Sequence, residues 1–210
     1  MSAEALPQVT TTGEPAAPGA GPGGARRRLL LTAALAVALG CLFFGYLRMA
    51  RVYPTNSDGA GNALQAWDIL HGNPLLRGWT LSDVSFYTTE LLLHAAVEMV
   101  VGLSADVVHI GAAVAYTLLV LLVALVARGR TRGRVAALRI GVALALMLAP
   151  APGIAYLTLL SSPDHTGTGI PLLLTWLVLE YALTARDGTP REGAARWWLP
   201  VALALLLAWG

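Results

Sequence analysis

The chain has 210 residues, of which 56% are hydrophobic and 12% are charged, and its mean hydropathy is +0.65. Soluble domains carry about 25% charged residues, so this composition excludes an ordinary soluble protein and predicts an all-α integral membrane protein, a multi-span helical bundle. The formal net charge of +2 favours no partner class, and the arginine clusters lack interleaved aromatic residues, so no nucleic acid is expected. Cys41 is the only cysteine, which excludes an intrachain disulfide.

The N-terminal segment divides into a tail and an apolar run. Residues 1–25 are rich in Ala, Pro, Gly and Thr without apolar periodicity, so a disordered cytoplasmic tail is expected. Arginines at 26–28 then precede an apolar run over 29–47, long enough to cross a hydrocarbon core of about 30 Å. A signal peptide is the alternative, but the run is long for one and lacks a convincing small-residue cleavage site.

Further apolar runs follow, and the basic residues between them orient the chain. We predict a transmembrane domain over 26–210, with spans at about 29–47, 105–127, 135–160, 170–185 and a partial span at 197–210, after which the chain looks cut off. The triple arginine predicts a cytoplasmic N-terminus, in a cell (plasma) membrane. Most of the 14 basic residues, all of them arginine, then lie inside; the exceptions are Arg48, Arg51 and Arg77.

A long outer loop over 48–104 is expected to carry two surface helices, at about 58–71 and 83–102, and a second outer loop covers 161–169. Asn56-Ser57-Asp58 supplies N-cap residues for the first helix, and Gly72 is placed to end it. The second helix carries its polar residues on one face of a helical wheel: Asp83, Tyr87, Glu90, His94 and Glu98. Either a span or a surface helix fits this segment; the arginines at 128–134 fall inside only if it is a surface helix, so we expect its polar face to look outward.

Four groups of residues could carry chemistry. Asp58 could act as a general base for a hydroxyl, or could merely cap its helix. Glu90, His94 and Glu98, spaced i, i+4, i+8, are candidate ligands for a divalent metal ion or a proton relay, or are an ordinary solvated face. The full HExxH zinc pattern is absent.

The other two groups are candidates for binding substrate and phosphate. Asp164 and His165 lie in a Ser/Gly/Thr loop that could fold over an outer site, although turn chemistry also explains them. Arg51 and Arg77, with Arg48, could bind a lipid phosphate, or could mark the outer interface. His109 and Glu180 are expected to be packing or interface groups unless they face a cavity.

The segment from Asn56 to Pro74, with an Asp soon after the first span, an Ala-rich helix and then Leu-x-Gly-x-Pro, resembles the first outer loop of GT-C-type membrane glycosyltransferases. That group includes protein mannosyltransferases and bacterial arabinosyltransferases, and the resemblance covers roughly residues 29–185. It implies that Asp58 is the catalytic base, which takes a proton from an acceptor hydroxyl. The hydroxyl oxygen would then attack a sugar carried on a polyprenyl phosphate, and phosphate would leave with help from Arg, His or a metal ion. Many relatives have a second acid next to this Asp, where this chain has Gly59, so the resemblance does not extend to a carboxylate pair.

The resemblance implies the N-terminal membrane module of an enzyme that moves a hexose or pentose at the outer membrane face, with membrane lipid and the lipid-linked sugar as partners. Relatives have more spans and often a C-terminal outer domain, so an inactive fragment is a further interpretation. The alternative from another class is a non-catalytic membrane partner protein or a transporter fragment. A transporter would place broken, polar helices near the midplane, whereas these polar groups gather near the outer surface.

Overall fold

The computed structural model describes residues 22–80, 86–149, 166–186, 201–203 and 205–206. All regular elements in these ranges are helices: α1 (Pro22–Ala50), α2 (Ser57–Leu70), a π-helical turn η1 (Tyr87–Leu91), α3 (Leu92–Val101), α4 (Asp106–Arg128), α5 (Gly133–Leu148) and α7 (Gly169–Arg186). By length and composition, the stretches Gly24–Ala50 and Asp106–Arg128 are able to cross a membrane, which weakly indicates a membrane protein.

The chain divides into two compact units, Met1–Ala38 and Leu39–Gly210. The described part of the first unit is the beginning of α1, whose leucines at 29–31 are 59% to 70% exposed. Helix α1 begins at Pro22, so the boundary of the predicted disordered tail, 1–25, is wrong at its end. Proline is well tolerated there, because the first turn of a helix has no use for its N–H.

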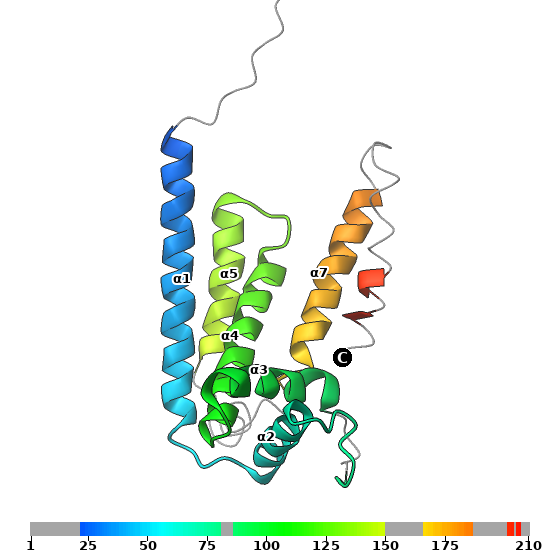
Figure 1. Cartoon of the computed structure of the whole chain (residues 1–210). Coiled ribbons are helices and arrows are strands. Elements are labelled where there is room, and N and C mark those ends of the chain that lie inside the picture. The colour runs from blue at the N-terminus through cyan, green and yellow to red at the C-terminus, as the bar shows by residue number, and fades with distance from the viewer. Residues whose placement is uncertain (1–21, 81–85, 150–165, 187–200, 204, 207–210) are drawn as a thin grey trace, which may run out of the picture. The chain divides into compact units, whose positions relative to one another are not determined.

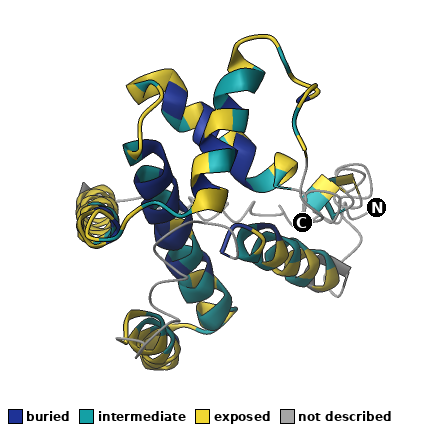
Figure 2. Ribbon diagram, turned by 90° about the horizontal axis from the view of Figure 1, so that it is seen from below, coloured by how far each residue is buried: buried dark blue, intermediate teal, exposed yellow. Residues whose placement is uncertain are grey.

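Helix α4 is the centre of the second unit. Helices α3, α5 and α7 pack against it, and α2 packs against α3 and η1. Helices α2 and α3 lie across the end of α4 at which that helix begins, while α5 and α7 run alongside it (Figure 1). Seen from that end, the buried residues gather where α2, α3 and α4 face one another (Figure 2).

The ends of α2 follow from local sequence. Asn56 caps its start, with Oδ1 accepting a hydrogen bond of 2.8 Å from the N–H of Gly59. At its end Gly72 has a φ of +99°, and the N–H groups of Gly72 and Asn73 donate to the carbonyls of Ile69 and Asp68. This is a Schellman motif, which satisfies the last carbonyls of the helix and turns the chain sharply.

Helix α5 is shorter than the span predicted over 135–160. It ends at Leu148, and Ala149 is extended because the proline that follows it disfavours helical backbone. The remainder of that predicted span, the predicted outer loop 161–169 up to residue 165, and most of the partial span 197–210 lie outside the described residues.

Candidate functional site

Asp58, the predicted catalytic base, lies in the first turn of α2 with its side chain exposed. The Ser57 hydroxyl donates to its Oδ1 at 3.3 Å. The cap of the helix is Asn56, so the interpretation that Asp58 merely caps α2 is wrong. Its carboxylate is therefore not committed to the helix backbone and is accessible to a molecule at this end of the protein.

The polar face of the predicted helix 83–102 turns inward, contrary to the expectation that it looks out into water. Glu90, His94 and Glu98 are all buried, at 3% exposure or less. We call these three residues the inner polar stripe. The apolar face is on the outside: Leu92, Met99 and Val100 are 54%, 71% and 84% exposed. Helix α3 is thus inverted relative to a surface helix of a soluble protein.

Partners on α2 and α4 explain why the stripe faces inward. The Asn62 side-chain amide donates to Oε2 of Glu90 at 3.1 Å, a buried hydrogen bond between α2 and η1. The His94 ring lies against Gly111 of α4, so closely that a Cβ at position 111 would be 2.9 Å from its Cδ2 and Nε2. A glycine on α4 therefore makes the space that the imidazole occupies.

The π-helical turn changes which residues share the stripe. The N–H of Leu91 reaches the carbonyl of Phe86 at 3.1 Å, one residue further than in an α-helix, which rotates the preceding residues relative to α3. Tyr87 consequently lies outside the stripe, 37% exposed, and its hydroxyl donates to the carbonyl of Pro74 at 2.6 Å. Asp83, the other predicted member, lies outside the described residues.

The inner polar stripe does not fit a metal ion. Residues i and i+8 on a helix are separated by about 12 Å along its axis, whereas metal ligands lie within about 2.6 Å of the ion. Within the described ranges, no three His, Cys, Asp or Glu side chains come together as a metal site. The prediction that Glu90, His94 and Glu98 together hold a metal ion is therefore not supported by their placement.

Glu98 is the unusual member of the stripe. Neither of its carboxylate oxygens has a hydrogen-bond partner in the described structure, although the side chain is 3% exposed. Burial raises the pKa of Glu98 to about 7, and the nearby His71 opposes this in part. Glu98 is thus able to exchange a proton near neutral pH, which keeps the predicted proton-relay role open to this residue.

The loop after α2 is tied to the last turns of that helix through Asp68. The Trp79 indole N–H donates to Asp68 Oδ2 at 2.9 Å, and the Asn73 side-chain amide donates to the same oxygen. These hydrogen bonds, that of Trp79 first, lower the pKa of Asp68. The Arg77 N–H donates to Asn73 Oδ1 at 2.8 Å, so the backbone of this candidate phosphate ligand is held in place while its side chain is exposed.

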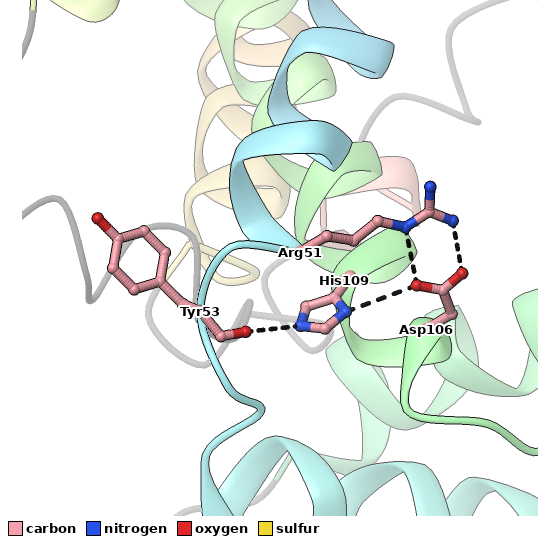
Figure 3. A network of polar contacts seen from close by, with 4 residues as sticks. All are labelled: Arg51, Tyr53, Asp106 and His109. Carbon is pink, nitrogen blue, oxygen red and sulfur yellow. Dashed lines mark hydrogen bonds and ion pairs between the residues drawn. The ribbon is translucent and has the colours of Figure 1, made fainter.

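Arg51, the other candidate phosphate ligand, is engaged by a carboxylate. Its guanidinium forms a two-point ion pair with Asp106 at the start of α4, with Nε 2.9 Å from Oδ1 (Figure 3). Asp106 Oδ1 lies 3.6 Å from Nδ1 of His109, and Nε2 of His109 lies 3.2 Å from the carbonyl oxygen of Tyr53 (Figure 3). The Asp106 hydrogen bond raises the pKa of Arg51.

This network ties the chain just after α1 to the first turns of α4, and sequence analysis did not find it. Arg51 and Asp106 are 55 positions apart, so no local spacing indicates the pair. The sequence indicated only that Arg51 and Asp106 both lie near the predicted outer interface. His109, predicted as a packing or interface group, is indeed buried in that role.

The structure separates the other candidates. Asp58 begins α2, whereas Arg77 belongs to the loop tied to its last turns, and the helix between them is about 20 Å long. Asp164 and His165 lie outside the described residues. Glu180 lies on α7 and lines a cavity near Arg130, at the end of α4 opposite to Asp106. The candidates therefore do not form one site within the described ranges.

Comparison with known protein families, with curated proteins and with solved structures finds no match to this chain.

Proposed function

We propose that the chain is a multi-span membrane protein with a cytoplasmic N-terminus, and that it forms the membrane module of a glycosyltransferase using a polyprenyl-phosphate-linked sugar. In this proposal Asp58 takes the proton of an acceptor hydroxyl, whose oxygen attacks the anomeric carbon of the sugar. The bond from that carbon to the phosphate oxygen breaks, and polyprenyl phosphate leaves. The reaction class comes from the resemblance, and the structure contributes the environment of Asp58.

The observation that carries the proposal is the accessible carboxylate of Asp58. Asn56 performs the capping that would otherwise occupy it, and a serine hydroxyl is its recorded hydrogen-bond partner. A general base needs an oxygen that can reach the proton of a substrate. Asp58 offers one in the first turn of α2, a helix that lies with α3 across the end of α4 (Figure 1).

The inverted helix α3 supports the membrane part of the proposal. Its outward residues, among them Met99 and Val100, would form an unfavourable apolar surface in water. The same surface is favourable against acyl chains at the membrane interface. An interfacial α3 would hold α2, and Asp58 with it, beside the headgroups from which a lipid-linked sugar must be drawn.

Two predicted contributors are left out of this mechanism. The inner polar stripe does not fit a metal ion, so no step runs through a metal there. Arg51 is paired with Asp106, and Arg77 lies at the far end of α2 from Asp58, so neither is assigned to the leaving phosphate.

The test is Asp58→Asn in the full-length protein, assayed in membranes with polyprenyl-phosphate-linked pentoses and hexoses. Loss of a general base lowers the rate by about 100-fold or more, and we expect that loss at unchanged protein level. Ala60→Ser, an exposed change in the same turn of α2, is the matched control and should retain transfer. Unchanged transfer in Asp58→Asn would reject the assigned base, whereas absence of transfer by the wild-type protein would favour a non-catalytic membrane partner.

A further inference from the structure

A cavity of about 550 Å³ lies at the end of α4 opposite to α2 and α3. Helices α5 and α7 both pack against α4, and the cavity is bounded by the C-terminal part of α4, the α4–α5 turn, α5 and α7. Its volume is in the range of ligand pockets, roughly 300–1,000 Å³. Apolar side chains form most of its wall: Val126, Trp176, Leu179 and Leu183.

Three charged side chains also line this cavity: Arg130 from the α4–α5 turn, Arg139 from α5 and Glu180 from α7. Within the described residues, none of the three forms an ion pair or hydrogen bond with another side chain. Arg130 and Arg139 are exposed and Glu180 is half-buried, so all three side chains are available to a ligand that carries complementary charges.

Gly129, which has no side chain, leaves room for Glu180 to lie close to the α4–α5 turn that carries Arg130. Gly129 has a φ of +49° and ends α4, and a Cβ placed on it would be 3.7 Å from Oε1 of Glu180. Glu180 therefore lies against the turn that carries Arg130. The cavity thus offers two guanidinium groups and one carboxylate around an apolar wall.

We infer that this cavity binds the headgroup of a zwitterionic aminophospholipid of the phosphoethanolamine type. Arginine donates in a planar fork that matches phosphate oxygens, so Arg130 and Arg139 receive the phosphate. Glu180 accepts hydrogen bonds from the primary ammonium group. The acyl chains follow the apolar wall formed by Val126 and the leucines of α7, and the Trp176 ring suits the boundary between headgroup and chain.

Glu180 is the residue that makes the cavity selective for this headgroup over those of other phospholipids. Phosphatidylglycerol has hydroxyl donors but no positive charge to complement the Glu180 carboxylate. Phosphatidylcholine carries a positive charge but no N–H to donate. The inference requires the helices to lie in a bilayer, as proposed above, and does not depend on sugar transfer.

The test measures lipid retention by native mass spectrometry on the purified full chain. The probes are phosphatidylethanolamine, phosphatidylglycerol and phosphatidylcholine with identical acyl chains. We expect phosphatidylethanolamine to be retained at least about 10-fold more strongly than either of the others, since only its headgroup brings a positively charged N–H donor to the Glu180 carboxylate. Equal retention of the three lipids, or preference for phosphatidylglycerol, would overturn the inference.

Variants locate the site. Glu180→Gln keeps the size of the side chain and should abolish the preference for phosphatidylethanolamine over phosphatidylglycerol, while Arg139→Gln should weaken retention of both. Arg134→Gln, an exposed arginine of α5 that does not line the cavity, is the matched control and should behave as wild type. Preference that persists in Glu180→Gln, or undiminished retention in Arg139→Gln, contradicts the assignment. Asp58→Asn should retain the preference, so failure of the sugar-transfer proposal is distinguishable from failure of this one.

Discussion

Polar side chains are packed between helices at the start of α4, whereas they line a cavity at its end. Where α4 begins, the Asn62–Glu90 hydrogen bond and the His94 ring against Gly111 fill the space between α2, η1, α3 and α4 with the protein's own atoms. Where α4 ends, Arg130, Arg139 and Glu180 surround a cavity without pairing with one another within the described residues. The first end is a packed junction, whereas the second leaves a cavity lined by charged and apolar side chains.

Gly111→Ala should give the largest stability effect at the packed end. A Cβ there would be 2.9 Å from the His94 ring, and overpacking of this kind costs about 1–3 kcal/mol. Thermal unfolding in detergent measures the loss. Gly141→Ala on α5 is the matched control: nothing lies within 4 Å of its Cβ position, so it should gain up to about 1 kcal/mol from helix propensity.

The same pair of glycines can contradict the packing argument. In a His94→Ala background, Gly111→Ala should cost little, because the ring that it meets is gone. Equal effects of Gly111→Ala and Gly141→Ala would show that α3 does not rest on α4 as described.

Glu98→Gln should change how stability depends on pH. The folded pKa of about 7 exceeds the ordinary value of 4.5, so the folded chain holds this proton more tightly than the unfolded chain. The stability from this proton is complete below pH 4.5 and is lost as the pH rises to about 7. Above that pH the charged carboxylate costs on the order of 1–2 kcal/mol, allowing for partial screening by water, and the variant should be more stable than wild type by that amount.

Unfolding temperatures measured between about pH 5 and 8 would show this as a flatter profile for Glu98→Gln. Met99→Gln places the same amide on the exposed face of α3 and should keep the wild-type slope. A wild-type profile that is already flat would mean that Glu98 is paired or hydrated in solution.

Arg51→Gln should give the smallest effect, because the ion pair with Asp106 is open to solvent. The two side chains are 49% and 41% exposed, and exposed pairs contribute about 0.2–1 kcal/mol. A double-mutant cycle with Asp106→Asn, at low and high salt, measures the coupling. A coupling free energy well above about 1 kcal/mol would contradict this prediction and show that the Arg51–Asp106 ion pair contributes as much as a buried contact.

The parts of the fold that could be predicted depend on neighbours in sequence. Asn56 and Gly72 predict the ends of α2 because caps act on backbone within a few residues, and the apolar run of α4 is visible in composition alone. The orientation of α3 could not be predicted from its helical wheel. The wheel places Glu98 and Met99 on different faces but does not say which face contacts protein. The rule that the polar face of a surface helix meets water predicted that Glu98 is exposed, which is wrong.

For the candidate site, the cluster Asn56-Ser57-Asp58 left open which residue caps α2; in the structure Asn56 is the cap and Asp58 is exposed. The partner of Arg51 was not predictable, because Asp106 meets it only through the packing of distant segments. The role of Gly111 was hidden for the same reason: nothing in the sequence around it shows that an imidazole from another helix needs the space.

The α4–α5 turn has one more consequence. Glycines at 129 and 133, with φ of +49° and +62°, act as joints on either side of a three-residue tether. Four residues, 129–132, join α4 to α5, so the adjoining ends of the two helices stay within about 17 Å of each other even if this connection is fully extended. Helix α7 follows α5 only after 20 residues, 149–168, so the chain itself constrains the side of the cavity formed by α7 less than the sides formed by α4 and α5.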